Sequence, residues 1–141
     1  MPAKGSAKWR GDLRTGAGTF AAGGTISGGY TCKSRFQDSP GSNPEQLVAA
    51  AHASCFSMAL ANALAESGHP PDLVRTDATV TLRPVEGAPT VTKVAQVTVG
   101  RVPGLDEAAF VDHAMAAKAG CPVSRALVSV PEITLEASLE P

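Results

Sequence analysis

The chain has 141 residues, of which 43% are apolar and 18% are charged, and its formal net charge at pH 7 is −1. This length supplies one folded domain with its own core, and the composition excludes an intrinsically disordered protein. A net charge near zero gives no electrostatic basis for binding nucleic acid or an acidic membrane surface. We therefore expect a single domain over residues 1–141 that binds neither.

The cysteine count and the opening residues indicate a compartment. Three cysteines are too few, and an odd number, for a disulfide-stapled secreted scaffold. The opening residues are basic and polar with no apolar stretch behind them, so no secretory signal is expected. Residues 47–65 carry no charge, but eight of the nineteen are Ala and four are His, Ser or Asn, which lipid tolerates poorly. These features predict a cytoplasmic protein in which this segment is a buried helix of a soluble fold.

A long central helix is the best-marked element of the sequence. Asn43 is a good N-cap, Pro44 suits the first helical position, and Gln46 stands where a capping-box partner belongs. Helix-forming residues continue to Ser67, and Gly68 with the prolines that follow is a usual stop. The prediction is a helix over residues 44–67, about 24 residues and roughly 36 Å long.

Hydrophobic periodicity predicts one further helix and two groups of strands. The second helix begins at the cap Asp106, ends at Gly120 and carries its apolar stripe at Phe110, Ala114 and Ala117. Alternation and glycine turns predict strands at residues 8–10, 18–20, 25–30, 78–82, 91–99 and 133–139. Clustered strands around two helices predict an α+β fold with the helices on antiparallel sheets.

The central helix also predicts an oligomer. Its apolar and alanine residues occur on every side, so it needs cover nearly all round. One small sheet and one short helix cannot easily supply that cover. We expect a second subunit to do so in a homodimer with closed twofold symmetry, the alternative being a monomer that wraps the helix with loops.

Two of the three cysteines are candidates for dithiol chemistry. Cys55 lies in mid-helix among small residues, where a free cysteine is more often a buried packing residue. Cys121 follows a helix-ending glycine and precedes a proline, where access from a loop is expected. Cys32 lies in the β-like stretch TCKSRF and is expected only to pack. Cys55 and Cys121 can form a disulfide only if the fold brings their Cα atoms to about 4.4–6.8 Å.

A reactive cysteine in mid-helix needs a nearby cation. An unperturbed thiol is only about 3% thiolate at pH 7, and the helix dipole fades before it reaches Cys55. An Arg suits this task better than a Lys because it stays charged when partly buried. Arg35 is the leading candidate, with Arg14 and Arg10 behind it. Glu45 is placed to hold such a guanidinium, and an acid in the first helical turn also stabilises the helix dipole.

Helix geometry separates Glu45 from Cys55. Ten residues of helix correspond to about 15 Å along the axis, and the two side chains leave the helix in different directions. One straight helix cannot bring both to the same reaction centre. If both serve one site, Glu45 must come from a second subunit whose central helix runs antiparallel to the first across a twofold axis.

Four stretches of the sequence carry a family likeness: NPEQLVAAAHASCFSMAL (43–60), SRF (34–36), AGCPVS (119–124) and KWRGDLRTGAGT (8–19). Together they resemble the OsmC/Ohr family of thiol-dependent peroxidases, and most of all its osmotically inducible branch. The resemblance covers nearly the whole chain. It implies an intertwined α+β homodimer with two sites at the subunit interface, in a bacterial cytoplasm, acting on organic hydroperoxides and more weakly on hydrogen peroxide.

The resemblance also implies roles for individual residues. Cys55 is the implied peroxidatic residue and Cys121 the resolving one, with Arg35 and Glu45 as the activating pair and Arg14 as the alternative arginine. No haem, metal or other cofactor is implied, and a lipoyl-type or other dithiol re-reduces the enzyme. The Cys55 thiolate would attack the distal peroxide oxygen, release alcohol or water, and become a sulfenic acid that Cys121 converts to a disulfide.

Two other interpretations remain open. His52 lies three residues before Cys55 and could act as the base of a cysteine-dependent acyl hydrolase or transferase. Alternatively, Cys55, His52 and Cys121 could bind zinc or another ligand in a non-enzymatic module.

Overall fold

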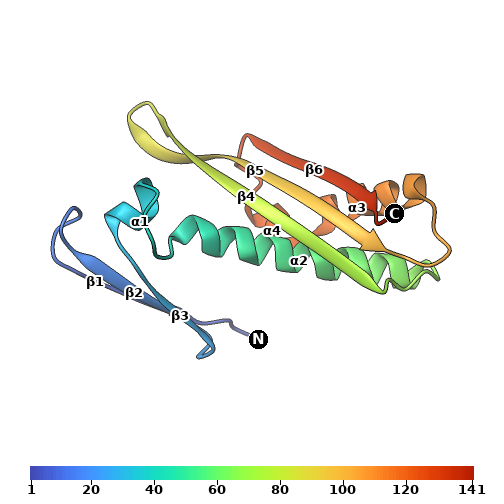
Figure 1. Cartoon of the computed structure of the whole chain (residues 1–141), viewed down its shortest axis with the longest axis horizontal. Helices are drawn as coiled ribbons and strands as arrows, with labels where there is room; N and C mark the ends of the chain where they lie inside the picture. Colours follow the sequence, from blue (N-terminus) through green and yellow to red (C-terminus); the bar gives the residue numbers. More distant parts are fainter. The chain divides into compact units, whose positions relative to one another are not determined.

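The computed structural model describes residues 1–141, which form six strands and four helices. The chain divides into two compact units, Met1–Leu47 and Val48–Pro141. Helix α2, Pro44–Glu66, begins in the first unit and continues through the second. The predicted α+β class is confirmed (Figure 1). The prediction that the chain is a single domain stays a prediction.

The first unit contains a three-stranded antiparallel sheet, and its strands in order are β1 (Gly5–Arg10), β2 (Ala17–Ala22) and β3 (Ile26–Tyr30). These are the three strands predicted for this part of the chain. Gly18 lies opposite both Trp9 and Tyr30, and a Cβ at this position would come within 2.8 Å of both rings. The glycine therefore allows the two aromatic rings to pack together, with centroids 5.5 Å apart.

Helix α1, Cys32–Phe36, corrects the expectation that this stretch is β-like. Thr31 caps the helix, because the Ser34 amide donates to Thr31 Oγ1 at 3.0 Å and the Thr31 amide donates to Ser34 Oγ at 2.8 Å. This reciprocal capping box satisfies the free amides of a very short helix and outweighs the β-propensity of the sequence. Cys32 therefore lies at the start of a helix.

The second unit contains a mixed three-stranded sheet of β4 (Leu73–Val85), β5 (Ala88–Arg101) and β6 (Glu132–Leu139). The antiparallel pair β4–β5 confirms the predicted paired unit, and its turn has positive φ at Glu86 and Gly87. The expectation of a wholly antiparallel sheet was wrong, because β6 runs parallel to β5. Helices α3 (Glu107–Gly120) and α4 (Pro122–Ala126) form the crossover that a parallel connection needs.

The core of the second unit lies between its helices and one face of this sheet. Helix α2 contributes a buried stripe in which every fourth residue points inward: His52, Phe56, Leu60 and Leu64. Helix α3 contributes its predicted stripe, Phe110, Ala114 and Ala117, and strand β6 adds Leu135, Ala137 and Leu139. The packing is close, since a Cβ at Gly100 of β5 would come within 2.5 Å of the Phe110 ring. The colours of Figure 1 show that α3 and α4 come between α2 and β6 in chain order.

Both ends of α2 follow the predicted signals. The Gln46 amide donates to Asn43 Oδ1 at 2.8 Å, and the helix ends at Glu66, one residue short of the prediction. Gly68 takes a left-handed conformation with φ of 87°, which suits glycine at a helix end. The last turn is closed by the His69 amide, which donates to the Leu64 carbonyl at 2.9 Å.

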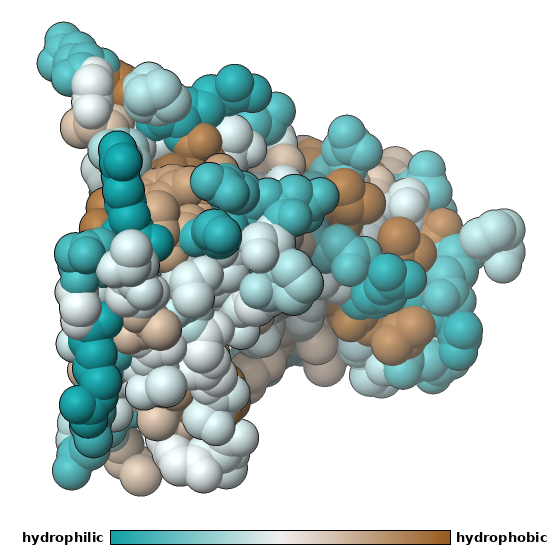
Figure 2. Space-filling view, turned by 60° about the vertical axis from the view of Figure 1, so that its left-hand side comes forward, coloured by the Kyte–Doolittle hydropathy of each residue, from teal (hydrophilic) through white to brown (hydrophobic).

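The side of α2 opposite its buried stripe is open in the single chain. Met58 is 75% exposed, and apolar side chains reach the surface in several separate groups among polar ones (Figure 2). By length and composition alone α2 is apolar enough to cross a membrane, a test that the core helix of a soluble protein also passes. A second subunit on this open side, in the homodimer that the sequence predicts, stays a prediction.

Candidate active site

The second unit brings together two cysteines that are 66 residues apart in the sequence. Cys55 is carried by α2, and Cys121 both ends α3 and begins α4. Both are free thiols, Cys55 packs against the buried cluster that includes Cys121, and each cysteine shifts the pKa of the other. The fold therefore places the two sulfurs within direct reach of each other, as dithiol chemistry requires.

The two cysteines differ in exposure, and in the opposite sense to the sequence-based expectation. Cys121 is completely buried, whereas Cys55 is partly exposed. The expectation of loop access to Cys121 was wrong because Pro122 begins helix α4 immediately, so no loop follows the cysteine. A small oxidant from solvent therefore meets the Cys55 sulfur first.

The two thiols also differ in acidity. Burial raises the pKa of Cys55, and the neighbouring Cys121 raises it further, while a hydrogen bond from the Val123 amide acts in the opposite direction. Burial alone would raise the pKa of Cys121 too, but hydrogen bonds from the Ser124 amide, the Cys55 thiol and the Ser124 hydroxyl bring it below its ordinary value. Contacts within this unit thus favour Cys121 as the thiolate, and Cys55 needs a cation from elsewhere.

The first unit contains the predicted pair of Arg35 and Glu45. Arg35 Nη2 lies 2.8 Å from Glu45 Oε1, and Arg35 Nε lies 3.2 and 3.3 Å from the two carboxylate oxygens. Charge-assisted bonds of this kind fix the plane of the guanidinium. The other two candidate arginines, Arg14 and Arg10, form no ion pair. The structure thus selects Arg35 as the arginine that Glu45 holds.

A pocket of about 280 Å³ in the first unit includes Arg35. Its lining is largely aromatic and apolar: Trp9, Leu13, Tyr30, Thr31, Cys32, Arg35 and Phe36. The Arg35 guanidinium also lies over the Phe36 ring, 5.1 Å from its centroid. A cation with apolar walls suits a ligand that has a polar group on a hydrocarbon body.

His52 forms a contact that sequence reasoning missed. It is completely buried, and its Nε2 lies 2.6 Å from the Ser124 hydroxyl. The predicted base for Cys55 is therefore hydrogen-bonded to a different residue. Ser124 itself could have been noticed, because in AGCPVS it stands three residues after Cys121, the spacing of two residues on one face of a helical turn. The chain contains no group of three His, Cys, Asp or Glu side chains placed to hold a metal ion.

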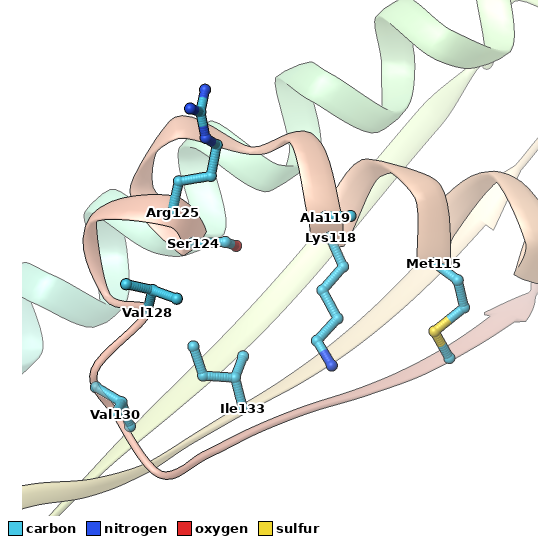
Figure 3. A pocket seen from close by; sticks show the side chains of 8 residues that line it. All are labelled: Met115, Lys118, Ala119, Ser124, Arg125, Val128, Val130 and Ile133. Atoms are coloured by element: carbon cyan, nitrogen blue, oxygen red, sulfur yellow. The ribbon is translucent and has the colours of Figure 1, made fainter.

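An open pocket of about 520 Å³ lies beside Ser124 (Figure 3). Its walls are mainly apolar and come from α3, α4, the segment that follows α4, and β6: Met115, Lys118, Ala119, Ser124, Arg125, Val128, Val130 and Ile133. Figure 3 shows Lys118 extending from α3 toward β6, while Arg125 points away from the pocket.

A partly exposed thiol packed against a cluster that holds a buried one is an arrangement that suits thiol redox chemistry. The comparisons identify the family. The family described as "OsmC-like protein" matches residues 36–136, and the chain belongs to that family, as the sequence predicted. It is 43% identical to "Peroxiredoxin OsmC" of Escherichia coli K12, over 97% of this chain and 96% of that protein.

Solved structures show the same fold at lower identity. The organic hydroperoxide resistance protein OhrB of Bacillus subtilis superposes with a TM-score of 0.70 at 24% identity, covering 99% of this chain and 98% of that one. An organic hydroperoxide resistance protein of Elizabethkingia anophelis superposes with a TM-score of 0.75 at 20% identity, covering 99% of both chains. At these identities the likeness establishes the fold alone.

Proposed function

We propose that this protein reduces organic hydroperoxides to alcohols, with Cys55 as the peroxidatic cysteine and Cys121 as the resolving one. That it is a peroxidase follows from its family and from its identity to "Peroxiredoxin OsmC" over nearly the full length. The observation that carries the finer proposal is the packing of Cys55, which is reachable from solvent, against the cluster that holds the buried Cys121.

The chemistry balances with the residues present. The Cys55 thiolate attacks the distal oxygen of the hydroperoxide, the O–O bond breaks, and the leaving alkoxide takes up a proton to become the alcohol. Cys55 is then a sulfenic acid. Cys121 attacks its sulfur, hydroxide leaves and is protonated to water, and the Cys55–Cys121 disulfide forms. A dithiol restores both thiols by exchange and becomes a disulfide itself.

Arg35 is the cation that we assign to the Cys55 thiolate. The contacts of Cys55 within its own unit raise its pKa, so the thiolate needs an external positive charge. Helix geometry prevents Glu45, and the guanidinium it holds, from serving Cys55 of the same straight helix. In the proposed homodimer the Arg35–Glu45 pair of one chain therefore acts on Cys55 of the partner subunit, and the apolar pocket at Arg35 receives the alkyl group.

Thiol counting tests this proposal. Reduced protein is titrated with cumene hydroperoxide and, separately, with hydrogen peroxide, and the cysteine pairing is mapped by mass spectrometry. We expect two thiols lost per hydroperoxide consumed, a Cys55–Cys121 bridge, and a faster reaction with the organic substrate. The Cys121→Ser variant should complete one turnover and stop, and Cys55→Ser should not react. Cys32→Ser is the matched control and should behave like wild type. A bridge that involves Cys32, or a reactive Cys55→Ser variant, would overturn the assignment.

A further inference from the structure

We infer that the hydrogen bond between His52 and Ser124 holds α4 against α2 and so keeps the two cysteines in place for disulfide formation. Both are positioning residues, because they act through the helices that carry them. The inference rests on the proposed function, since it concerns the step that joins Cys55 to Cys121. Its basis is one contact, the 2.6 Å between His52 Nε2 and Ser124 Oγ, and the place of that contact in the two helices.

This hydrogen bond lies one helical turn from each cysteine. On α2, His52 precedes Cys55 by three residues. In the first turn of α4, Ser124 follows Cys121 by three residues, and the Arg125 amide donates to the Cys121 carbonyl at 3.0 Å. Residues three apart are neighbours on a helix surface, with Cβ atoms about 5–6 Å apart. A bond between one residue of each pair therefore restricts how far the other two, the cysteines, can move apart.

Helix α4 depends on its neighbours for its position. It has only five residues, and a helix this short is not stable by itself in water. Cys121 is its N-cap but makes no side-chain capping hydrogen bond. Ser124 is the one buried residue of this helix, and its contact with His52 joins α4 directly to α2. Loss of this contact therefore loosens the element that begins directly after Cys121.

The burial of the imidazole gives the bond its direction. His52 is fully buried, and its Nδ1 has no hydrogen-bond partner. Orphaned N–H groups are rarer in protein interiors than orphaned acceptors, so the proton of the neutral ring belongs on Nε2. His52 Nε2–H therefore donates to Ser124 Oγ. Removing either partner leaves the other buried and unsatisfied, which costs more than an exposed hydrogen bond would.

The chemical consequence falls on the second half of the reaction. Cys121 is fully buried, and Cys55 packs against the cluster that contains it. A disulfide forms only when the Cα atoms are about 4.4–6.8 Å apart. When the Cys121 sulfur attacks the Cys55 sulfenic sulfur, the S–S bond forms, the S–O bond breaks, and the departing hydroxide takes up a proton to become water. Holding the two groups together in advance speeds this step and favours the bridge over the separate thiols.

Matched substitutions separate this role from simple packing. Gln at position 52 carries its amide nitrogen about as far out as Nε2, whereas Asn reaches only as far as Nδ1, and both place an amide in the same site. Ser124→Thr keeps the hydroxyl and Ser124→Ala removes it. We expect His52→Asn and Ser124→Ala to slow bridge formation about five- to tenfold, the effect of one buried hydrogen bond, and His52→Gln and Ser124→Thr to recover most of the rate.

The double variant adds a readout that packing losses would not give. If the two residues act through their shared hydrogen bond, His52→Asn/Ser124→Ala should be no slower than either single variant, because the bond is already lost in each. Two independent packing defects would instead multiply. Multiplied effects in the double variant therefore overturn the inference.

Two measurements follow the bridge, both in a Cys32→Ser background. The first is the equilibrium with glutathione, in which each bridge formed consumes one oxidised glutathione and releases two reduced ones, and no hydroperoxide is present. The second is the loss of dimedone-reactive sulfenic acid after one equivalent of cumene hydroperoxide. The initial oxidation of Cys55 is its internal reference and should change less than about twofold, because that step precedes the attack of Cys121.

The glutathione equilibrium decides the inference apart from the proposed function. It should shift toward the thiols by the same five- to tenfold factor in His52→Asn and in Ser124→Ala. An unshifted equilibrium in both, or a parent protein that forms no bridge with glutathione, overturns the inference. If the parent forms the bridge with glutathione but not with hydroperoxide, the proposed function fails, while the shift between variants still shows whether this hydrogen bond positions the cysteines.

Discussion

Mixing a slow variant with an inactive one tests whether the activating pair and the reactive cysteine come from different subunits. One chain carries Glu45→Gln and the other carries Cys55→Ser. Gln keeps the shape of Glu45 but loses the charge that Arg35 Nε and Nη2 bind at 2.8–3.3 Å. Since the Arg35 side chain is 36% exposed, solvent screens part of the loss. We take the loss of transition-state stabilisation as about 1–1.4 kcal/mol. The homodimer of the Glu45→Gln chain should therefore react five- to tenfold more slowly than wild type.

The mixture itself has a definite expected activity. Random pairing of equal amounts gives about half heterodimers in a closed twofold dimer. Each heterodimer has one complete site, built from Cys55 of the Glu45→Gln chain and Glu45 of the Cys55→Ser chain, and one site that lacks both. The mixture should therefore recover roughly a quarter of wild-type activity, with a small addition from the Glu45→Gln homodimers.

The assay is consumption of cumene hydroperoxide with a dithiol in excess, after the two variants have been unfolded, mixed and refolded together. Each variant refolded alone is the control. If activity after mixing equals the mean of the two separate variants, the sites lie within single chains and the assignment of Glu45 to the partner subunit is refuted. Size-exclusion chromatography of the same samples reports whether dimers formed.

Three further outcomes follow from single observations. Because burial lowers the pKa of His52, the unfolded state binds more protons than the folded state below pH 6.5. The contribution of His52 to the free energy of unfolding should be complete above that pH and fall below it by at most about 1.4 kcal/mol per pH unit. Urea unfolding of His52→Gln should lose this pH dependence. Gly100→Ala should cost about 1–3 kcal/mol, because its Cβ would lie 2.5 Å from the Phe110 ring; a change under 0.5 kcal/mol in chemical denaturation contradicts this packing. Iodoacetamide should modify Cys55 before the fully buried Cys121 in native reduced protein, and peptide mapping that finds the reverse order contradicts the exposures.

The helices that the sequence predicted well have capping or stop residues at their own ends. The cap at Asn43 and the stop at Gly68 delimit α2 to within one residue. The cap at Asp106, whose carboxylate accepts from the Ala109 amide at 2.8 Å, does the same for α3. Local hydrogen bonding determines these boundaries, so a local sequence pattern is enough to find them.

The elements that it predicted poorly depend on information that no short pattern contains. Helices α1 and α4 have five residues each, which is too short for a helical hydrophobic period to appear. Alternation finds β6 but is the same in parallel and antiparallel strands, so the parallel pairing with β5 could not be read from it. Direction depends on the crossover, which is a property of the whole second unit.

The candidate site divides in the same way. The sequence predicted Arg35 with Glu45, and the structure contains that ion pair. It also predicted Cys55 with Cys121; Cys55 packs against the cluster that includes Cys121, and the roles of the two cysteines stay predictions. It did not predict the bond between His52 and Ser124, because those residues are 72 positions apart and each looks ordinary in its own segment. A buried histidine with one short hydrogen bond becomes visible only once the packing of α2 against α4 is known.

Helix α4 is what makes the two sulfurs unequal. It begins at Pro122, directly after the completely buried Cys121, and the Ser124 and Val123 amides of its first turn lower the pKa of the Cys121 thiol. Burial alone would make Cys121 a poor nucleophile, and the added donors reverse that effect without exposing it. A sulfur that is acidic yet hidden from solvent can react with the sulfenic acid beside it while remaining protected from the oxidant. The same stabilisation makes Cys121 the better leaving group, so a reducing dithiol should attack the disulfide at Cys55, the sulfur it can also reach. Trapping the mixed disulfide on Cys55 in Cys121→Ser, and finding none on Cys121 in Cys55→Ser, is the expected result, and the opposite pattern would show that access does not follow burial here.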